Sequence, residues 1–116
     1  MWSIGVILYI MLAGKPPFYG RTDREILQKV TNGSYDLNSD LWKKRSNDVK
    51  DLIRGLMERD VTKRMTAAQA LQHKWIQRKV HSEFDVELAK VTLGNLQDFR
   101  VRISDNNFTR FRRRKN

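Results

Sequence analysis

The chain lacks cysteine altogether and has only two prolines and two histidines among its 116 residues. The missing cysteine excludes disulfide bonds, thiolate metal sites and cysteine nucleophiles. The two histidines, His73 and His81, are too few for a histidine-rich metal centre, and we expect no metal site. The stability of the fold must therefore come from the packing of side chains.

A hydrophobic run long enough to cross a bilayer is also missing. The longest apolar stretch is MWSIGVILYIMLA at residues 1–13, in which 11 of 13 residues are apolar. A membrane span needs about 20 apolar residues, and the sequence GKPP at 14–17 ends this run early. A secretory signal is the alternative, but no basic segment precedes the apolar run. We expect residues 1–13 to form a helix buried in the core.

Acidic residues are the scarcer charge, with 13 Asp+Glu against 23 Lys+Arg and a net charge of +10. The imbalance is greatest over residues 100–116, which hold seven basic residues and one acidic residue. A basic tail can bind nucleic acid, anionic lipid or an acidic protein groove, and composition does not choose among them. The length fits one domain, and 40% hydrophobic residues are typical of a globular protein.

Strand patterns are missing as well, because no alternation of apolar and polar residues lasts beyond four positions. Helix signals recur instead. A capping box at Thr22–Glu25 begins a helix that we expect to end at Gly33. Ser46 begins a second helix with an apolar face, and another capping box at 66–69 leads into a third that includes Trp75. Residues 14–20 and 33–42 are predicted loops. The sequence therefore predicts an all-α body.

Three motifs occur in a fixed order: WSIGVILY with GKPPF at 2–18, RDVTKRMTA at 59–67 and ALQHKWI at 70–76. They resemble helix F and its following loop, the R-D-P-x-x-R-x-T-A run and the A-L-x-H-P-W-I run of eukaryotic protein kinases. Val61 and Lys74 replace the usual prolines. The resemblance covers residues 1–79 and implies the second half of the kinase large lobe, with helices F, G, H and I. FYG at 18–20, GSYD at 33–36 and DLW at 40–42 look most like the calcium-dependent protein kinases.

The segment VTLGNLQDFR at 91–100 is similar to the start of the junction helix that follows the kinase domain in that group. The resemblance implies a linker at 80–88 and an autoinhibitory amphipathic helix at 89–102. The resemblance ends after Arg102, and we expect residues 103–116 to form a basic, flexible tail. The apolar stripe at Ala89, Leu93, Leu96 and Phe99 is modest. In the family this helix continues into calcium-binding EF-hands, but the chain contains no D-x-D-x-D-G loop. The regulatory candidates are Leu93, Leu96, Phe99, Arg100 and Arg102, and the two arginines are expected to face acidic positions of the lobe.

The motifs of phosphoryl transfer are not found in these 116 residues: G-x-G-x-x-G, V-A-I-K, H-R-D and D-F-G do not occur. No residue can therefore be named as catalytic, as a cofactor ligand or as a metal ligand. The resemblance implies ATP and magnesium for the complete kinase only.

Scaffold roles can be carried over from the family by resemblance. Ile7 and Met11 would support the spine of side chains beneath the adenine, or would simply be core residues. Arg64 resembles the arginine that pairs with a glutamate of the activation segment. That glutamate does not occur in these residues, and loss of the pair would cost about 3–5 kcal/mol. A solvated helix-end arginine is the alternative.

The other family positions are structural. We expect Trp42 and Trp75 to anchor the core and His73 to make a structural hydrogen bond. Pro17, Phe18 and Tyr19 could shape a peptide-docking edge or could serve only to pack the loop. The full set of structural family positions is Trp2, Gly5, Pro17, Phe18, Trp42, Arg64, His73 and Trp75.

The expected function follows from the resemblance: part of a serine/threonine protein kinase of the calcium-dependent type, intracellular and cytoplasmic. Its partners would be protein substrates, the small lobe with the catalytic half of the kinase, and a calcium-sensor domain. Nucleic acid is not expected as a partner. Two alternatives stay open. One is a short, non-catalytic regulatory protein derived from a kinase, and the other is a binder of anionic polymers through residues 110–115.

Overall fold

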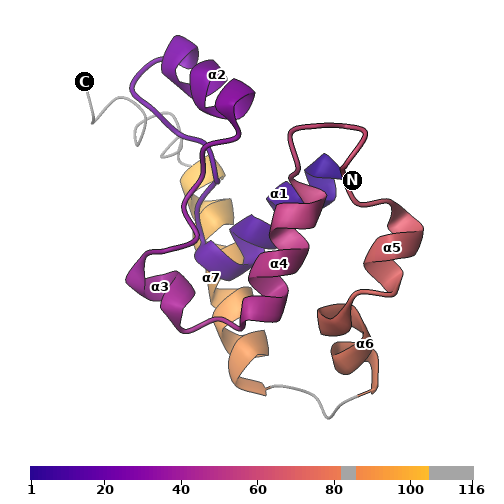
Figure 1. Ribbon diagram of the computed structural model, residues 1–116. Coiled ribbons are helices and arrows are strands. Elements are labelled where there is room, and N and C mark those ends of the chain that lie inside the picture. The colour runs from indigo at the N-terminus through magenta and orange to yellow at the C-terminus, as the bar shows by residue number, and fades with distance from the viewer. Residues whose placement is uncertain (82–85, 105–116) are drawn as a thin grey trace.

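The computed structural model describes residues 1–81 and 86–104. This part of the chain folds into helices without any strand, which confirms the all-α prediction (Figure 1). Helices α1 and α4 form the centre, with α7 against α1 and with α5 and α6 on the far side of α4. The helices are α1 (Trp2–Ala13), α2 (Asp23–Asn32), α3 (Asp40–Lys43), α4 (Asn47–Leu56), α5 (Ala67–Leu71), α6 (Lys74–His81) and α7 (Val86–Ser104).

The helix starts predicted from the sequence are confirmed. Thr22, Ser46 and Thr66 each accept a hydrogen bond from the backbone N–H three residues later, at 3.1, 3.2 and 3.2 Å. The side chain of Gln69 also accepts from the Thr66 backbone N–H, which completes the capping box. Helix α2 ends at Gly33 in the left-handed conformation, with φ 63°. Local sequence alone therefore sets these boundaries.

Several boundaries differ from those predicted from the sequence. The short helix α3 lies inside the predicted loop 33–42, where its first turn brings Trp42 into the core with no exposed surface. The helix predicted from residue 66 through Trp75 is divided into α5 and α6. The division falls at His73, whose imidazole accepts the Trp75 backbone N–H at 3.1 Å and so begins a new helix. The predicted linker 80–88 is helical at both ends, since α6 extends to His81 and α7 begins at Val86.

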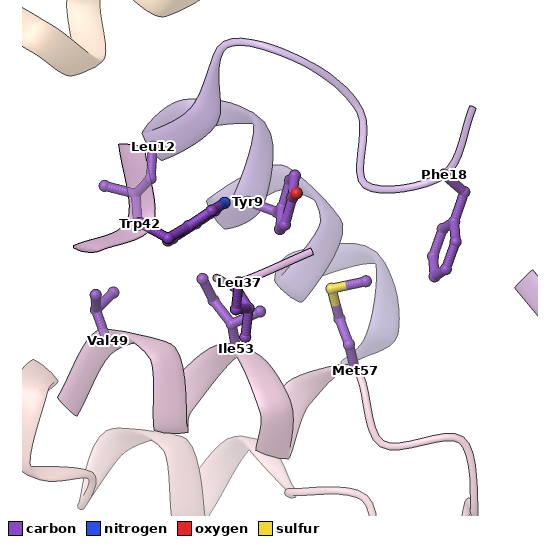
Figure 2. Packing of buried hydrophobic residues seen from close by; sticks show 8 residues of the cluster. All are labelled: Tyr9, Leu12, Phe18, Leu37, Trp42, Val49, Ile53 and Met57. Carbon is purple, nitrogen blue, oxygen red and sulfur yellow. The ribbon is translucent and has the colours of Figure 1, made fainter. Parts of the chain in front are cut away.

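The core lies between α1, α4 and the loops around α3 (Figure 2). Helices α1 and α4 approach closely at Gly5, where an added Cβ would lie 2.6 Å from the Cγ of Met57. The phenol of Tyr9 donates to the main-chain oxygen of Asp36 at 2.8 Å, which ties α1 to the loop before α3. The buried cluster consists of Tyr9, Leu12, Phe18, Leu37, Trp42, Val49, Ile53 and Met57.

Helix α1 is buried on one side only, so the prediction of a core helix holds for that side alone. Gly5, Tyr9 and Leu12 are buried, whereas Ile4 and Ile7 are 53% and 56% exposed. The reason is that α4 and α7 cover only part of its circumference. None of the described helices is both long and apolar enough to cross a membrane.

Candidate functional site

An open apolar groove of about 220 Å³ runs beside α1. The two predicted spine positions, Ile7 and Met11, lie together on its wall, but Ile7 is exposed there and is not part of the core. The groove offers apolar contact surface and no polar group. Its lining comes from α1 (Ile4, Ile7, Leu8 and Met11), α4 (Leu52 and Leu56), α5 (Ala70) and α6 (Trp75 and Ile76).

Helix α7 packs on α1 through a directional bond as well as apolar contact. The side-chain amide of Asn95 donates to the main-chain oxygen of Met11 at 2.9 Å. This carbonyl belongs to the last turn of α1, where carbonyl groups lack the amide of a following turn. Leu88 packs against the core cluster. The sequence does not point to Asn95, because a polar residue gives no signal in a pattern of apolar stripes.

The predicted regulatory stripe on α7 is only partly covered by the rest of the structure. Leu93 and Leu96 are 58% and 39% exposed, and only Phe99 and Ala89 are half-buried. Arg100 is exposed, and the side chain of Arg102 lies outside the described residues. The face of α7 that is covered lies at a different angle around the helix axis from the predicted stripe. It consists of half-buried residues: Leu88, Val91, Thr92, Asn95 and Phe99.

The loop after α1 is fixed to the start of that helix by aromatic packing. The rings of Trp2 and Phe18 stack with centroids 5.8 Å apart and planes 5° apart, and Phe18 meets Tyr35 edge-on at 5.9 Å. Pro17 is buried. These contacts give the loop a packing role, and a peptide-docking role for it stays a prediction.

The guanidinium of Arg64 has partners within the described structure. Its Nε donates to the main-chain oxygen of Glu58 at 2.8 Å, and Nη2 reaches the oxygen of Arg59 at 3.5 Å. The guanidinium carbon also lies 5.3 Å from the ring centroid of Trp2. Main-chain oxygens and the face of Trp2 contact the half-buried Arg64, so the cost expected of an arginine without partners does not apply in this structure. Its pairing with an activation-segment glutamate stays a prediction.

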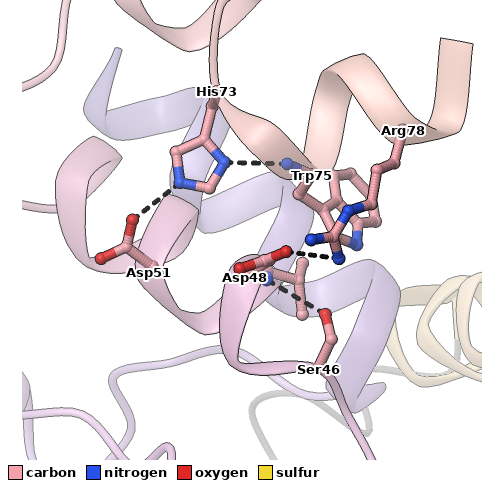
Figure 3. A network of polar contacts seen from close by, with 7 residues as sticks. Ser46, Asp48, Asp51, His73, Trp75 and Arg78 are labelled. Atoms are coloured by element: carbon pink, nitrogen blue, oxygen red, sulfur yellow. Dashed lines mark hydrogen bonds and ion pairs between the residues drawn. The ribbon is translucent and has the colours of Figure 1, made fainter.

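The predicted structural hydrogen bond of His73 is confirmed (Figure 3). Its Nε2 lies 2.7 Å from Asp51 Oδ2, while Nδ1 accepts the backbone N–H of Trp75. In the neutral ring the proton must therefore sit on Nε2 and point to Asp51. A second link joins α6 itself to α4, because Arg78 Nη1 lies 2.6 Å from Asp48 Oδ2. Polar contacts of α6 thus hold it on α4.

The residues described do not fit an ATP or magnesium site. No group of three or more His, Asp or Glu side chains in residues 1–81 and 86–104 could hold a metal ion. The sequence also has no glycine-rich loop to cradle phosphates.

Comparison with known proteins agrees with a helical part of a protein kinase domain. The family described as "Protein kinase domain" matches residues 1–76, and the chain belongs to this family. Calcium-dependent protein kinase 19 of Arabidopsis thaliana is 47% identical over 101 residues, covering 87% of this chain and 18% of that protein. Calcium-dependent protein kinase 3 of Plasmodium yoelii yoelii is 40% identical over 100 residues, covering 85% and 19%.

Calcium/calmodulin-dependent protein kinase type 1B of Rattus norvegicus is 49% identical over 76 residues, covering 66% of this chain and 22% of that protein. The chain thus spans about a fifth of the length of these relatives. A match over 101 of 116 residues must include part of α7, whereas one over 76 residues need not. Similarity to the calcium-dependent kinases therefore extends into the helix that packs on α1.

Proposed function

We propose that the chain is the second half of the large lobe of a serine/threonine protein kinase of the calcium-dependent type. Helix α7 would be the first part of its regulatory helix. The complete enzyme would transfer the γ-phosphate of ATP, with magnesium, to Ser or Thr hydroxyls of proteins. A cytoplasmic location and regulation by a calcium sensor belong to the same proposal. The 116 residues of this sequence would supply scaffold and no catalytic group.

The apolar groove beside α1 carries the proposal. Leaving a large aliphatic side chain exposed forfeits about 1.5–3 kcal/mol of burial, and Ile4 and Ile7 are both more than half exposed here. A contiguous apolar face of this kind marks an interaction surface. Since the family match accounts for residues 1–76, we infer that the rest of the kinase domain covers the groove.

Reconstitution with the catalytic half tests this proposal. The chain is produced alone and together with the small lobe and catalytic segment of a calcium-dependent relative, then incubated with labelled ATP, magnesium and a basic protein substrate. We expect no phosphotransfer from the chain alone, and both a complex and phosphotransfer from the pair. Ile7→Asp should prevent the complex, because it places a carboxylate in the groove.

The matched control for Ile7→Asp is Leu93→Asp, which changes a similarly exposed apolar residue on the outer side of α7. It should leave the complex intact. Phosphotransfer by the homogeneous chain alone, or equal loss of the complex in the two variants, would contradict the proposal. A short regulatory protein, by contrast, would bind an intact kinase and not the separated catalytic half.

The regulatory role of α7 needs its own test. A peptide of residues 86–104 is assayed as an inhibitor of an active calcium-dependent kinase that lacks its own junction. We expect Phe99→Ala to weaken inhibition strongly, because Phe99 lies on the covered side of α7, and Leu93→Ala to change it little. Equal potency of the three peptides would show that charge alone is recognised. The alternative based on residues 110–115 falls outside the described residues.

A further inference from the structure

A second cavity, of about 300 Å³, differs from the apolar groove in its chemistry. It lies between the α1–α2 loop and the loop before α3, with one wall from α1 and one from α2. Its lining includes three tyrosines, two lysines and one aspartate: Tyr9, Lys15, Tyr19, Lys29, Tyr35 and Asp36. Cavities that combine aromatic faces with a few convergent polar groups are typical of binding sites.

Two ammonium groups are held at one aromatic ring in this cavity. The Nζ of Lys15 lies 5.7 Å from the ring centroid of Tyr19, and the Nζ of Lys29 lies 5.0 Å from it. Lys29 also donates to the main-chain oxygen of Tyr19 at 2.7 Å. Cation–π contacts and this hydrogen bond place both positive charges at the wall of the cavity.

The nearby carboxylates are largely committed to other partners. One oxygen of Asp36 accepts the backbone N–H groups of Asn38 and Ser39 at 2.8 and 3.2 Å. The hydrogen bond from Asn38 is the main cause that lowers the pKa of Asp36, so this carboxylate stays ionised while it holds its own loop.

Glu25 is shared in the same way. Its Oε2 accepts the Arg21 backbone N–H at 3.1 Å, and its Oε1 lies 3.8 Å from the ammonium of Lys29. Lys15, in contrast, has no ion-pair partner within 4.0 Å among residues 1–81 and 86–104. The charge of Lys15 acts on Asp36 across the cavity and helps to lower the pKa of that carboxyl, but no ion pair within the described part of the chain ties up its ammonium donors.

We propose that this cavity binds an anionic side chain of a peptide, either a carboxylate or a phosphate monoester. Lys15 would donate to the anion from one side, Lys29 would add its charge, and the tyrosine faces would pack against the neighbouring peptide atoms. A phosphate monoester should bind more tightly than a carboxylate, because it carries more charge and three acceptor oxygens. The site is built without α7 or the apolar groove, and its occupation does not depend on phosphotransfer.

Titration of the isotope-labelled 116-residue chain by NMR tests this site. The probes are three end-capped pentapeptides that differ only in the central residue, which is phosphoserine, glutamate or glutamine. We expect saturable shifts of the backbone amides of Lys15, of residues 18–20 and of residues 34–38, tightest with phosphoserine, weaker with glutamate and undetectable with glutamine. Lys15→Gln should weaken phosphopeptide binding about tenfold, equal to about 1.4 kcal/mol, and Lys15→Arg should largely restore it.

Lys63→Gln is the matched control, since it removes the same charge from an exposed turn outside the cavity. Ser34→Glu is a second variant that leaves Lys15 intact and places a carboxylate on the cavity lining, and it should abolish binding.

Equal weakening by Lys15→Gln and Lys63→Gln would overturn the site, because only the net charge of the chain would then attract the anion. Shifts spread over the whole basic surface, or equal binding of the glutamine peptide, would overturn it as well. The titration measures binding and not activity. A negative result would therefore disprove the anion site without bearing on the kinase proposal, which the reconstitution experiment tests separately.

Discussion

The side-chain amide of Asn95 in α7 donates to the main-chain oxygen of Met11 in α1, 84 positions earlier in the chain. The bond supplies a donor to a carbonyl at the end of α1, where no further helical turn can do so. It also fixes the rotation of α7 about its own axis more sharply than apolar contact does, because a hydrogen bond weakens steeply with angle. The polar bond thus explains why Leu93 and Leu96 face outward.

Asn95→Ala should loosen α7 while the core remains. We expect the free energy of unfolding to fall by about 0.5–1.5 kcal/mol, the usual contribution of one hydrogen bond. Amide hydrogen exchange in α7 should accelerate more than exchange in α4. Gln97→Ala, at an exposed position of the same helix, should stay within about 0.5 kcal/mol of the original chain. Equal effects of the two changes would mean that the Asn95 bond contributes nothing.

Gly14→Ala should cost more than Gly33→Ala. Both glycines have positive φ, 74° and 63°, and an alanine there costs about 1–2 kcal/mol. A Cβ at Gly14 would also lie 2.9 Å from Asn95 Oδ1, whereas the nearest atom to one at Gly33 is 3.7 Å away. In urea unfolding, the extra cost at Gly14 should disappear when Asn95→Ala is combined with it. Persistence of that extra cost in the double variant would exclude Asn95 as its cause.

His73→Ala should destabilise the contact between α4 and α6 by about 1–3 kcal/mol. The change removes the acceptor of the Trp75 backbone N–H and the donor to Asp51. Asp51→Asn should cost less than about 1 kcal/mol, because the Asp51 side chain is 71% exposed and an amide oxygen can still accept. Chemical denaturation of both variants measures this order, and a larger effect of Asp51→Asn would contradict it.

Tyr9→Phe should change how stability depends on alkaline pH. Burial raises the pKa of the Tyr9 phenol from 10.0 to about 12, so the folded chain keeps this proton after the unfolded chain has lost it. The phenol therefore stabilises the fold fully below pH 10, and this contribution is lost as pH rises toward 12. Near pH 7 the original chain should be more stable by about 1 kcal/mol, through the bond to Asp36.

The measurement is urea unfolding of both chains from pH 7 to pH 12. The advantage of the original chain should shrink above pH 10, while lysine ionisation affects both chains alike. A difference that stays constant across this range would contradict the assigned pKa of Tyr9.

Helix starts and the role of His73 could be predicted because the deciding contacts are local in sequence. Thr22, Ser46 and Thr66 each bond three residues ahead, and His73 bonds two residues ahead to Trp75. The order of motifs was enough to predict the kinase family, which the match over residues 1–76 confirms.

The covered face of α7 and the surroundings of Arg64 could not be predicted, since each depends on residues brought together by the tertiary fold. Asn95 meets a carbonyl 84 positions away, and Arg64 meets the ring of Trp2 at the other end of the lobe sequence. The covered side of α1 could not be predicted for a related reason. Its apolar residues surround the whole helix, so its sequence does not say which side α4 covers. The close approach at Gly5 decides that.

The groove beside α1 makes the unfolding free energy of this chain depend on what else is in solution. A ligand that binds only the folded state adds RT ln(1 + [L]/Kd) to stability, about 2.7 kcal/mol at a hundredfold excess over Kd. Any apolar segment seated on Ile4 and Ile7 acts as such a ligand, whether it comes from the same polypeptide, a separate catalytic half or another copy at high concentration. A melting temperature of this chain therefore has meaning only with its concentration and partner stated, and its rise on adding a partner measures how well that partner fits the groove.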